Sequence, residues 1–382
     1  MIYKHGNTWF DTVNLRVSVG ERLFSDGSLI PPVPPAALRA VQAVVTRRCN
    51  LACTYCNVRL SGDSAADMSS EIGDRVVSAA AEAPRGRLVM VTGGEPLLLP
   101  ELSLSILERV DPPKVIFTNA ALVTSAIASR LKEIAVSPIV SLDGPEDIHN
   151  SRRSGSWNQV SRGLDFLSEA GVQFGLSTVV GSHNWKNISI WMQEMLHRFR
   201  PVSMGFNILH WTPGGFDPIS AEFYADAMVN VFDTALKHGV FVDQIARRID
   251  PLITAEYRHR DCSALGDKLV FHPDGLKSNC ICGRSVEDWS GRIPSALDYC
   301  RDCPASGICG GGCAWDAIHL GGSGLPDKRH CIWVRRILDR ILLDVQNSFP
   351  YGPVSREELK IRYGALVTRG LSTLTSSLGH GE

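Results

Sequence analysis

The chain has 382 residues, of which 44% are hydrophobic and 21% are charged, and its formal net charge is −1. This is ordinary globular composition, and the near-zero charge argues against a surface that coats nucleic acid. No apolar run is long enough to span a bilayer, and the first residues lack the apolar core of a signal peptide. We therefore expect a cytoplasmic protein with neither a membrane nor a nucleic-acid partner.

The chain has 11 cysteines, and they are grouped rather than scattered. Three lie within residues 49–56, and the other eight lie within residues 262–331. In a reducing cytosol, grouped cysteines are more often metal ligands than disulfide partners. The sequence therefore predicts two separate stretches of metal-binding cysteines.

Residues 1–39 are expected to form a few strands and a proline-rich linker. Beyond them, short β-rich runs alternate with amphipathic helical segments, which predicts βαβ units on a parallel sheet. We predict an α/β fold over residues 40–250, either a partial barrel of six β/α units or a strongly curved open sheet. The six runs are residues 40–46, 88–94, 114–120, 138–144, 173–181 and 202–209.

Polar or glycine-rich signatures lie at or just after the carboxyl ends of the first four runs. Cys49 follows the first run, and the ends of the next three overlap GGEP (residues 93–96), TNA (118–120) and SLDGP (141–145). The carboxyl ends of parallel strands meet at one edge of a sheet, where ligands bind. We therefore expect these signatures on one rim.

After about residue 250 the sequence becomes rich in turns and cysteines, and we predict a second domain over residues 251–345. Residues 346–382 are expected to contain a helix, SREELKIRYGALV (355–367), followed by a mobile tail.

Cys49, Cys53 and Cys56 form a Cys-x3-Cys-x2-Cys motif after the first predicted strand. In this position the motif resembles that of the radical S-adenosylmethionine (radical SAM) superfamily. The resemblance implies that three thiolates hold a [4Fe–4S] cluster whose fourth iron binds the amine and carboxylate of SAM. Reductive cleavage of SAM then releases a 5′-deoxyadenosyl radical.

The resemblance also implies SAM contacts along the rim: an aromatic ring near the adenine, the GGEP turn at the amino group, a serine at the ribose and an arginine at the carboxylate. The matching residues are Tyr55, Gly93, Gly94, Glu95, Pro96, Ser141 and Arg153. Arg152 competes with Arg153 for the carboxylate. Asn119 is a weaker match, because the glycine that usually follows it in the family is Ala120 here.

Seven cysteines of the second stretch resemble the SPASM domain that follows many radical SAM barrels. The resemblance implies two auxiliary [4Fe–4S] clusters, and therefore three clusters in all. The implied ligands are Cys300, Cys303, Cys309 and Cys331 for the farther cluster, and Cys262, Cys280 and Cys313 for the nearer one. A zinc-ribbon-like scaffold with two four-cysteine zinc sites is the alternative.

The nearer set lacks the fourth cysteine that relatives carry shortly before the first one. Cys282 is the substitute that we favour, two residues after Cys280. Alternatively, Cys282 is a spare thiol packed beside the cluster, and one iron is open to a substrate group or takes another ligand.

SPASM-bearing relatives mostly modify peptides, so the resemblance predicts a precursor peptide as substrate and an electron donor such as flavodoxin or ferredoxin. We favour a maturase that abstracts a side-chain hydrogen and forms a cross-link, a C–C cyclophane ahead of a thioether. A sulfatase-maturing enzyme that makes formylglycine is disfavoured, because Ile281 stands where those relatives carry a catalytic aspartate. A non-catalytic iron–sulfur or zinc scaffold that binds a peptide is the third alternative.

The base that cross-linking needs is not identified by any motif. Asp143, His210 and Asp217 on the rim are the candidates, and a hydrogen-bonded structural role is the alternative for each. Asp267 and Asp274 lie near the second cysteine stretch, and we expect them to cap turns.

Overall fold

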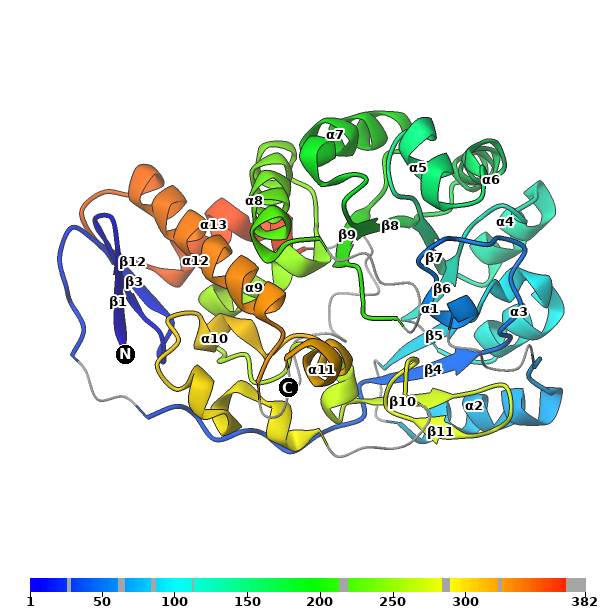
Figure 1. Ribbon diagram of the computed structural model, residues 1–382, viewed down its shortest axis with the longest axis horizontal. Helices are drawn as coiled ribbons and strands as arrows, with labels where there is room; N and C mark the ends of the chain where they lie inside the picture. Colours follow the sequence, from blue (N-terminus) through cyan, green and yellow to red (C-terminus); the bar gives the residue numbers. More distant parts are fainter. Residues whose placement is uncertain are drawn as a thin grey trace. The chain divides into compact units, whose positions relative to one another are not determined.

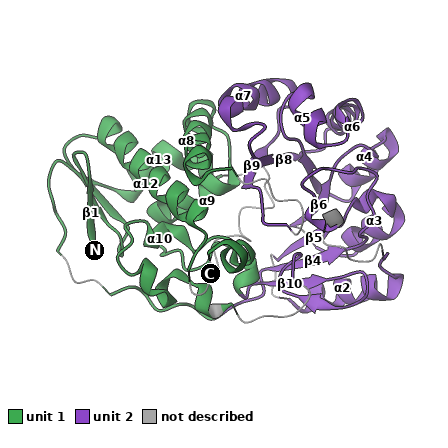
Figure 2. Ribbon diagram, viewed as in Figure 1, with its two compact units in different colours: residues 1–35, 219–265, 288–368 green, residues 36–218, 266–287, 369–382 purple. Residues whose placement is uncertain are grey.

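The computed structural model describes residues 1–25, 29–60, 66–83, 87–111, 113–212, 219–283, 289–321 and 325–368. The chain divides into two compact units (Figure 2). The first, here called the barrel unit, contains residues 36–218 and 266–287. The second, here called the helical unit, contains residues 1–35, 219–265 and 288–368.

Six parallel strands form the centre of the barrel unit, and each overlaps one of the predicted runs. The predicted α/β fold is therefore confirmed. The first two strands are buried along their whole length, as expected for parallel strands covered on both faces. In chain order, which is also their order in the sheet, they are β4 (Ala40–Val44), β5 (Leu88–Thr92), β6 (Lys114–Thr118), β7 (Ser137–Ser141), β8 (Gly175–Val180) and β9 (Ser203–Ile208).

Helices connect successive strands of this sheet (Figure 1). Polar caps fix where some of them begin: the Ser69 side chain accepts a hydrogen bond from the N–H of Ile72, and the Thr124 side chain accepts one from the N–H of Ile127. The helices of this unit are α1 (Asn57–Leu60), α2 (Ser70–Glu82), α3 (Pro100–Glu108), α4 (Ser125–Glu133), α5 (Glu146–Arg152), α6 (Trp157–Glu169) and α7 (Ile188–Phe199).

One face of the sheet changes from apolar to polar toward the carboxyl ends of the strands. Near the amino ends it carries an apolar cluster that includes Leu88 and Met90. Side chains alternate between faces, so Ser141 and Ser177, which are register partners, share this face near the other end. Asn207 donates a hydrogen bond from Nδ2 to the Ser177 Oγ at 3.1 Å. Polar groups therefore gather at the predicted rim.

Two further strands extend the sheet beyond β4. Strand β10 (Lys268–Phe271) pairs in parallel with β4, and β11 (Lys277–Ser278) pairs antiparallel with β10. This hairpin lies within residues 251–345, where we expected a separate domain. Its strands of four and two residues are too short for a periodic pattern to reveal them.

The helical unit joins both ends of the described chain in one antiparallel sheet. The few strands predicted before residue 39 are present, and β12 pairs with β3. Helix α13 confirms the helix predicted at 355–367 and begins with a capping box between Ser355 and Glu358. The elements are β1 (Ile2–His5), β2 (Thr8–Asp11), β3 (Arg16–Val19), β12 (Gly352–Val354), α8 (Ala221–His238), α9 (Asp243–Thr254), α10 (Ser306–Cys309), α11 (Ala314–Asp316), α12 (Lys328–Ser348) and α13 (Arg356–Val367).

The two units do not follow the domain limits predicted at residues 39, 250 and 345. Residues 219–250 belong to the helical unit because α8 packs against α12, with the rings of Tyr224 and Trp333 edge to face at 6.1 Å. These helices are about a hundred residues apart in sequence, so local patterns do not pair them. The predicted mobile tail lies outside the described residues. Across the described ranges, no helix combines the length and the apolarity that crossing a bilayer requires.

Candidate functional site

The three cysteines of the first motif lie between β4 and α1, at the carboxyl end of the first parallel strand. Burial raises the pKa of the Cys53 thiol to about 11, and negative charge at Cys56 and Cys49 adds to the rise. The three thiols are thus close enough to oppose one another's ionisation. Cationic iron relieves that repulsion, so this donor set fits a cluster held by three thiolates.

The C-terminal end of α5 supports the cysteine loop. The N–H of Ala52 donates to Ser154 Oγ at 2.8 Å, and the N–H of Thr54 donates to the carbonyl oxygen of Arg152 at 3.0 Å. Sequence reasoning missed Ser154, which belongs to no motif. Arg152 acts here through its backbone, while its guanidinium donates to Ser182 Oγ at 3.4 Å.

The two glycines after β5 lie directly against the backbone that precedes the cysteine loop. The N–H of Gly94 donates to the carbonyl oxygen of Thr46 at 2.8 Å. A Cβ added at Gly93 would overlap that same oxygen, and one added at Gly94 would lie 2.6 Å from the carbonyl carbon of Arg48. The first two strand ends are therefore so close that only glycine fits between them.

Replacing Gly94 with alanine is expected to displace the cysteine loop, because the added methyl group meets backbone rather than a movable side chain. We expect a loss of at least about 2 kcal/mol in the free energy of unfolding, together with loss of the iron held by this loop. Urea unfolding and iron analysis measure both effects. Gly364→Ala is the control: it lies in α13 with nothing within 4 Å of the added Cβ, so a gain of about 1 kcal/mol is expected. Equal free energies of unfolding and equal iron contents in the two variants would contradict the predicted clash.

Glu95 holds the GGEP turn against the end of β6, and its side chain is fully buried. Oε1 accepts hydrogen bonds from Thr118 Oγ1 at 2.7 Å and from the N–H of Leu97 at 3.0 Å, and Oε2 accepts one from the N–H of Asn119 at 2.7 Å. Burial raises the pKa of Glu95 to about 7, although these hydrogen bonds lower it in part.

The raised pKa of Glu95 predicts a pH-dependent stability. The unfolded glutamate ionises near pH 4.5 and the folded one near pH 7, so the contribution is fully present below pH 4.5. It is lost as the pH rises to 7, with a decrease of about 3 kcal/mol in the free energy of unfolding. Urea unfolding at pH 5 and pH 7.5 measures this decrease. Because glutamine does not titrate, Glu95→Gln should lack this part of the pH dependence. If the free energy of unfolding changed with pH identically in both proteins, the raised pKa would not belong to Glu95.

Asn119 links the end of β6 to the cysteine loop. Its Nδ2 donates to Asn50 Oδ1 at 2.9 Å and lies 3.7 Å from Cys49 Sγ. Its Oδ1 accepts a hydrogen bond from the N–H of Ala121 at 2.9 Å, so it also caps a turn. The next residue, Ala120, has a φ of +61°, a left-handed conformation that favours glycine. This conformation accounts for the glycine expected there by resemblance.

Asp143, directly after β7, is a fully buried carboxylate that joins several rim residues. It accepts hydrogen bonds from Arg153 Nε at 2.9 Å and Nη2 at 3.3 Å, and from the Tyr55 hydroxyl. The N–H of Val179 donates to it at 3.1 Å. Burial raises the pKa of Asp143, but the Arg153 charge and these hydrogen bonds outweigh burial and lower it. This geometry makes Asp143 an ionised anchor, with both oxygens occupied, rather than a proton acceptor.

His183 belongs to the same buried group, and no sequence motif marks it. Its ring stacks on Tyr55 with ring centroids 6.3 Å apart, and its Nε2 lies 3.9 Å from Asp143 Oδ2. The Arg153 guanidinium lies over the Tyr55 ring at 5.4 Å. Arg153 rather than Arg152 therefore shares the site with Tyr55.

The remaining predicted rim residues are not all brought together. Ser141 is partly exposed at the end of β7, next to Ser177 of β8. His210 follows β9 and is exposed. Asp217 lies outside the described residues.

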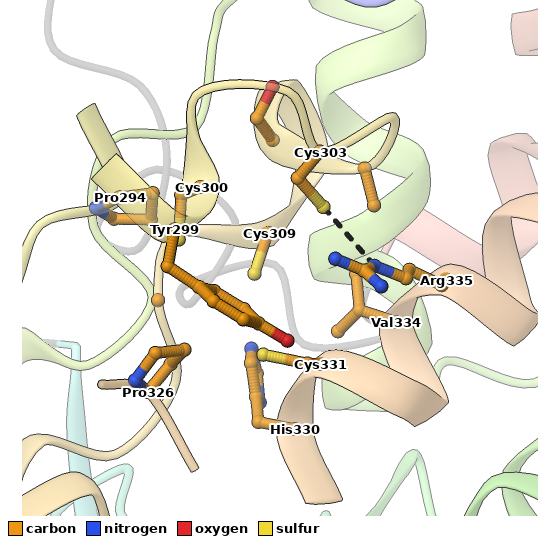
Figure 3. Close-up of a pocket in the computed structure, with 13 residues that line it drawn as sticks. Pro294, Tyr299, Cys300, Cys303, Cys309, Pro326, His330, Cys331, Val334 and Arg335 are labelled. Carbon is orange, nitrogen blue, oxygen red and sulfur yellow. Dashed lines mark hydrogen bonds between the residues drawn. The ribbon is translucent and has the colours of Figure 1, made fainter. Parts of the chain in front are cut away.

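Four cysteines of the second stretch line one pocket of the helical unit, and Figure 3 shows their thiols around it. Burial raises the pKa of Cys300 to about 11 and that of Cys331 to about 12, and neighbouring thiolates add to both. Arg335 Nε donates to Cys303 Sγ at 3.4 Å. Such a donor set fits a polynuclear metal centre. The four are Cys300, Cys303, Cys309 and Cys331.

The other cysteines of this stretch are divided between the units. Cys262 and Cys313 belong to the helical unit, whereas Cys280 and Cys282 follow β11 in the barrel unit. The N–H of Cys282 lies 3.4 Å from Cys280 Sγ, and hydrogen bonding from the Cys282 side chain lowers the pKa of Cys280. Cys282 is therefore an immediate neighbour of a predicted ligand.

Of two nearby aspartates, Asp274 caps a turn as expected from the sequence, whereas Asp267 bonds to a backbone group far away in the chain. Asp274 Oδ1 accepts a hydrogen bond from the N–H of Leu276 at 3.2 Å, and Asp267 Oδ1 accepts one from the N–H of Ala37 at 3.2 Å.

Asp261, directly before Cys262, is the shared anion of a buried arginine cluster. It accepts hydrogen bonds from Arg248 and from Arg258 Nε, the latter at 3.2 Å, and Arg247 Nη1 lies 3.7 Å away. Burial raises the pKa of Asp261, but the three arginines lower it far more. Arg248 also donates to the carbonyl oxygen of Ile308 at 2.7 Å. The cluster thus ties the chain at Cys262 to the loop at Cys309.

Comparison with protein families gives these sites a context. The family model for the radical SAM superfamily matches residues 43–193. The chain carries a radical SAM domain. The match runs from β4 to α7 and contains the three-cysteine loop, the GGEP turn and Asp143. The family prediction is confirmed for residues 43–193, and the match supports SAM and one SAM-binding [4Fe–4S] cluster as cofactors.

Two curated relatives differ in how much of the chain they match. The Fe-coproporphyrin III synthase of Methanosarcina barkeri is 31% identical over 151 residues, which are 38% of this chain and 37% of that protein. The chain thus spans well under half of that relative. The radical SAM cyclopropyl synthase TigE of Paramaledivibacter caminithermalis is 21% identical over 368 residues, covering 82% of this chain and 76% of TigE.

Two solved structures share the fold beyond the radical SAM domain. The sulfatase maturase anSMEcpe, with bound AdoMet and the Cp18Cys peptide, has a TM-score of 0.67 and 20% identity, covering 83% of this chain and all of that chain. Streptococcus suis SuiB bound to its precursor peptide SuiA has a TM-score of 0.59 and 14% identity, covering 78% and 76%. At these identities the likeness concerns the fold.

Proposed function

We propose that this protein is a radical SAM enzyme that matures a ribosomally made precursor peptide by forming an intramolecular cross-link. The observation that carries the proposal is the three-thiol loop, fixed by hydrogen bonds at the polar rim of the barrel sheet. A [4Fe–4S] cluster and SAM, if bound there, would supply a 5′-deoxyadenosyl radical for abstraction of a side-chain hydrogen.

The chain's own residues position these groups. Cys49, Cys53 and Cys56 would hold the cluster. The GGEP turn, packed closely against the backbone that precedes their loop, would bind the SAM amino group. Asp143 orients Tyr55 and Arg153, which by the family resemblance would contact the adenine and the carboxylate of SAM. Ser141, at the end of β7, would contact the ribose.

The rest of the chain supports a peptide substrate and further clusters. anSMEcpe and SuiB, which share this fold, were solved with peptides bound. The four-cysteine pocket and the set Cys262, Cys280, Cys282 and Cys313 are proposed to hold two auxiliary clusters, with flavodoxin or ferredoxin as electron donor. A C–C bond between an aromatic ring and a neighbouring Cβ is the favoured product, and a thioether is the alternative.

Mass spectrometry of a candidate peptide tests the proposal. The reconstituted, reduced protein is incubated with SAM and the peptide encoded beside its gene. We expect 5′-deoxyadenosine and a peptide that has lost two hydrogen atoms, with tandem spectra locating a C–C or C–S bond. An aldehyde in place of a Ser or Cys side chain would instead indicate formylglycine. No 5′-deoxyadenosine with any peptide would leave the non-catalytic scaffold as the better interpretation.

Formylglycine formation is the less favoured enzyme function. Ile281 occupies the position where the resemblance implies an aspartate base, and an alkyl side chain accepts no proton. Asp274, in the same hairpin, uses its carboxylate to cap the N–H of Leu276.

Changing Cys282 to alanine is expected to lower the iron content and alter the electron paramagnetic resonance (EPR) signal of the nearer auxiliary cluster. The reason is that Cys282 lies beside Cys280 and is the substitute for the missing fourth ligand. Cys280→Ala is the positive control and should cause at least as large a loss. Wild-type iron content and an unchanged EPR spectrum in Cys282→Ala would make Cys282 a spare thiol.

A further inference from the structure

A continuous chain of side-chain hydrogen bonds runs between two cysteine loops of the barrel unit. Arg47, two residues before Cys49, places its Nη2 3.1 Å from His272 Nδ1. On the other side of the ring, His272 Nε2 lies 2.7 Å from Ser278 Oγ. The Ser278 hydroxyl in turn donates to the carbonyl oxygen of Cys280 at 2.8 Å.

The chemistry of the groups fixes the direction of each hydrogen bond. Arginine can only donate, so His272 Nδ1 accepts and its Nε2 carries the proton that is donated to Ser278. Every step therefore points from Arg47 toward Cys280. His272 and Ser278 are fully buried, so water does not compete for these bonds.

The pairing of β10 with β4 explains why these groups meet. His272 directly follows β10, and Arg47 comes shortly after β4, its parallel neighbour. Arg47 and its neighbour Arg48 also form the backbone against which the GGEP turn packs. The hydrogen bonds therefore connect the segment just before Cys49 to the backbone of the Cys280 loop.

We propose that His272 is a positioning residue that couples the SAM-binding loop to the Cys280 loop, so that SAM bound at the first loop orders the second. The inference rests on the proposed function, since it requires SAM at the Cys49 loop. Coupling is reciprocal: iron held by Cys280 should also strengthen SAM binding, and typical couplings change affinity by about 5-fold to 150-fold.

Hydrogen–deuterium exchange of the anaerobically reconstituted protein, with and without SAM, tests this coupling. In the wild type, SAM should slow exchange at residues 49–56 and also at residues 276–283. In His272→Phe, which keeps a ring but removes both hydrogen bonds, SAM should still protect residues 49–56, whereas protection of residues 276–283 should be lost. The dissociation constant for SAM should rise at least about fivefold.

Three further variants separate coupling from general damage to the fold. Ser278→Ala interrupts the series of hydrogen bonds next to Cys280 and leaves Arg47 unchanged. It should also abolish the protection of residues 276–283. His272→Gln, whose amide can both accept and donate, should restore part of it. Asp274→Ala is the matched control. It removes a hydrogen bond in the same hairpin, but Asp274 is not part of the series of hydrogen bonds from Arg47 to Cys280, so SAM should still protect residues 276–283.

The outcomes distinguish this inference from the proposed function. Protection of residues 276–283 that is equal in the wild type, His272→Phe and Ser278→Ala would overturn the coupling and leave the function intact. The coupling would also be overturned, and the function left intact, if SAM protected residues 49–56 but not residues 276–283 in the wild type. Absence of any response to SAM at residues 49–56 would overturn both.

Discussion

Asp143→Asn is expected to lower the free energy of unfolding by about 3–5 kcal/mol, because it removes the counter-charge of a buried arginine. Arg153 makes two hydrogen bonds to this carboxylate, and the Tyr55 hydroxyl makes a third. Without the carboxylate both side chains lose their orientation, so SAM affinity should fall at least about tenfold. Urea unfolding and equilibrium binding of SAM measure the two effects.

Asp147→Asn is the matched control for this prediction. Asp147 lies in the first turn of α5, is exposed, and comes shortly after Asp143 in the chain. Removing its charge should lower the free energy of unfolding by no more than about 1 kcal/mol, which is the contribution of a favourable charge at a helix N-terminus. A SAM affinity that is unchanged in Asp143→Asn would show that Tyr55 and Arg153 do not depend on this anchor.

Asp261→Asn should destabilise the helical unit by about 3–5 kcal/mol, because it leaves the buried Arg248 and two partly buried arginines without their shared anion. Arg247, Arg248 and Arg258 all surround this carboxylate. Since Arg248 also binds the carbonyl oxygen of Ile308, the loop at Cys309 should loosen and the pocket should lose iron. Urea unfolding and iron analysis of the purified variant measure the loss.

An exposed aspartate–arginine pair provides the control for Asp261. The side chains of Asp298 and Arg301 are 89% and 71% exposed, so Asp298→Asn should change stability little or not at all. If Asp261→Asn were equally harmless, the arginine cluster would not be what holds the two cysteine loops together.

The alternation of β-rich and helical segments correctly predicted the six parallel strands, because buried parallel strands have a strong local pattern. The spacing of Cys49, Cys53 and Cys56 and the GGEP turn likewise predicted the radical SAM domain, since both motifs are short and continuous in sequence. The four cysteines that the SPASM resemblance assigns to one cluster line the pocket in the helical unit.

Contacts between distant segments were not predictable in this way. The pairing of β3 with β12 and of α8 with α12 joins residues far apart in the chain, so the limits of the two units did not emerge from composition. His183 and His272 belong to no motif, and only packing brings them to the site. In the sequence Asp143 is a candidate base with a hydrogen-bonded structural role as the alternative, and in the fold Arg153 and Tyr55 occupy its oxygens.

The sequence by itself therefore determined the chemistry that this protein can support: three grouped thiols, a glycine turn and a second stretch of cysteines. These features are local, because the spacing of ligands along a loop is set by the loop itself. Only the tertiary structure decided which charged side chains are anchors and how the Cys280 loop is tied to the SAM-binding loop. Those roles depend on burial and on partners contributed by other strands, and no local pattern encodes them.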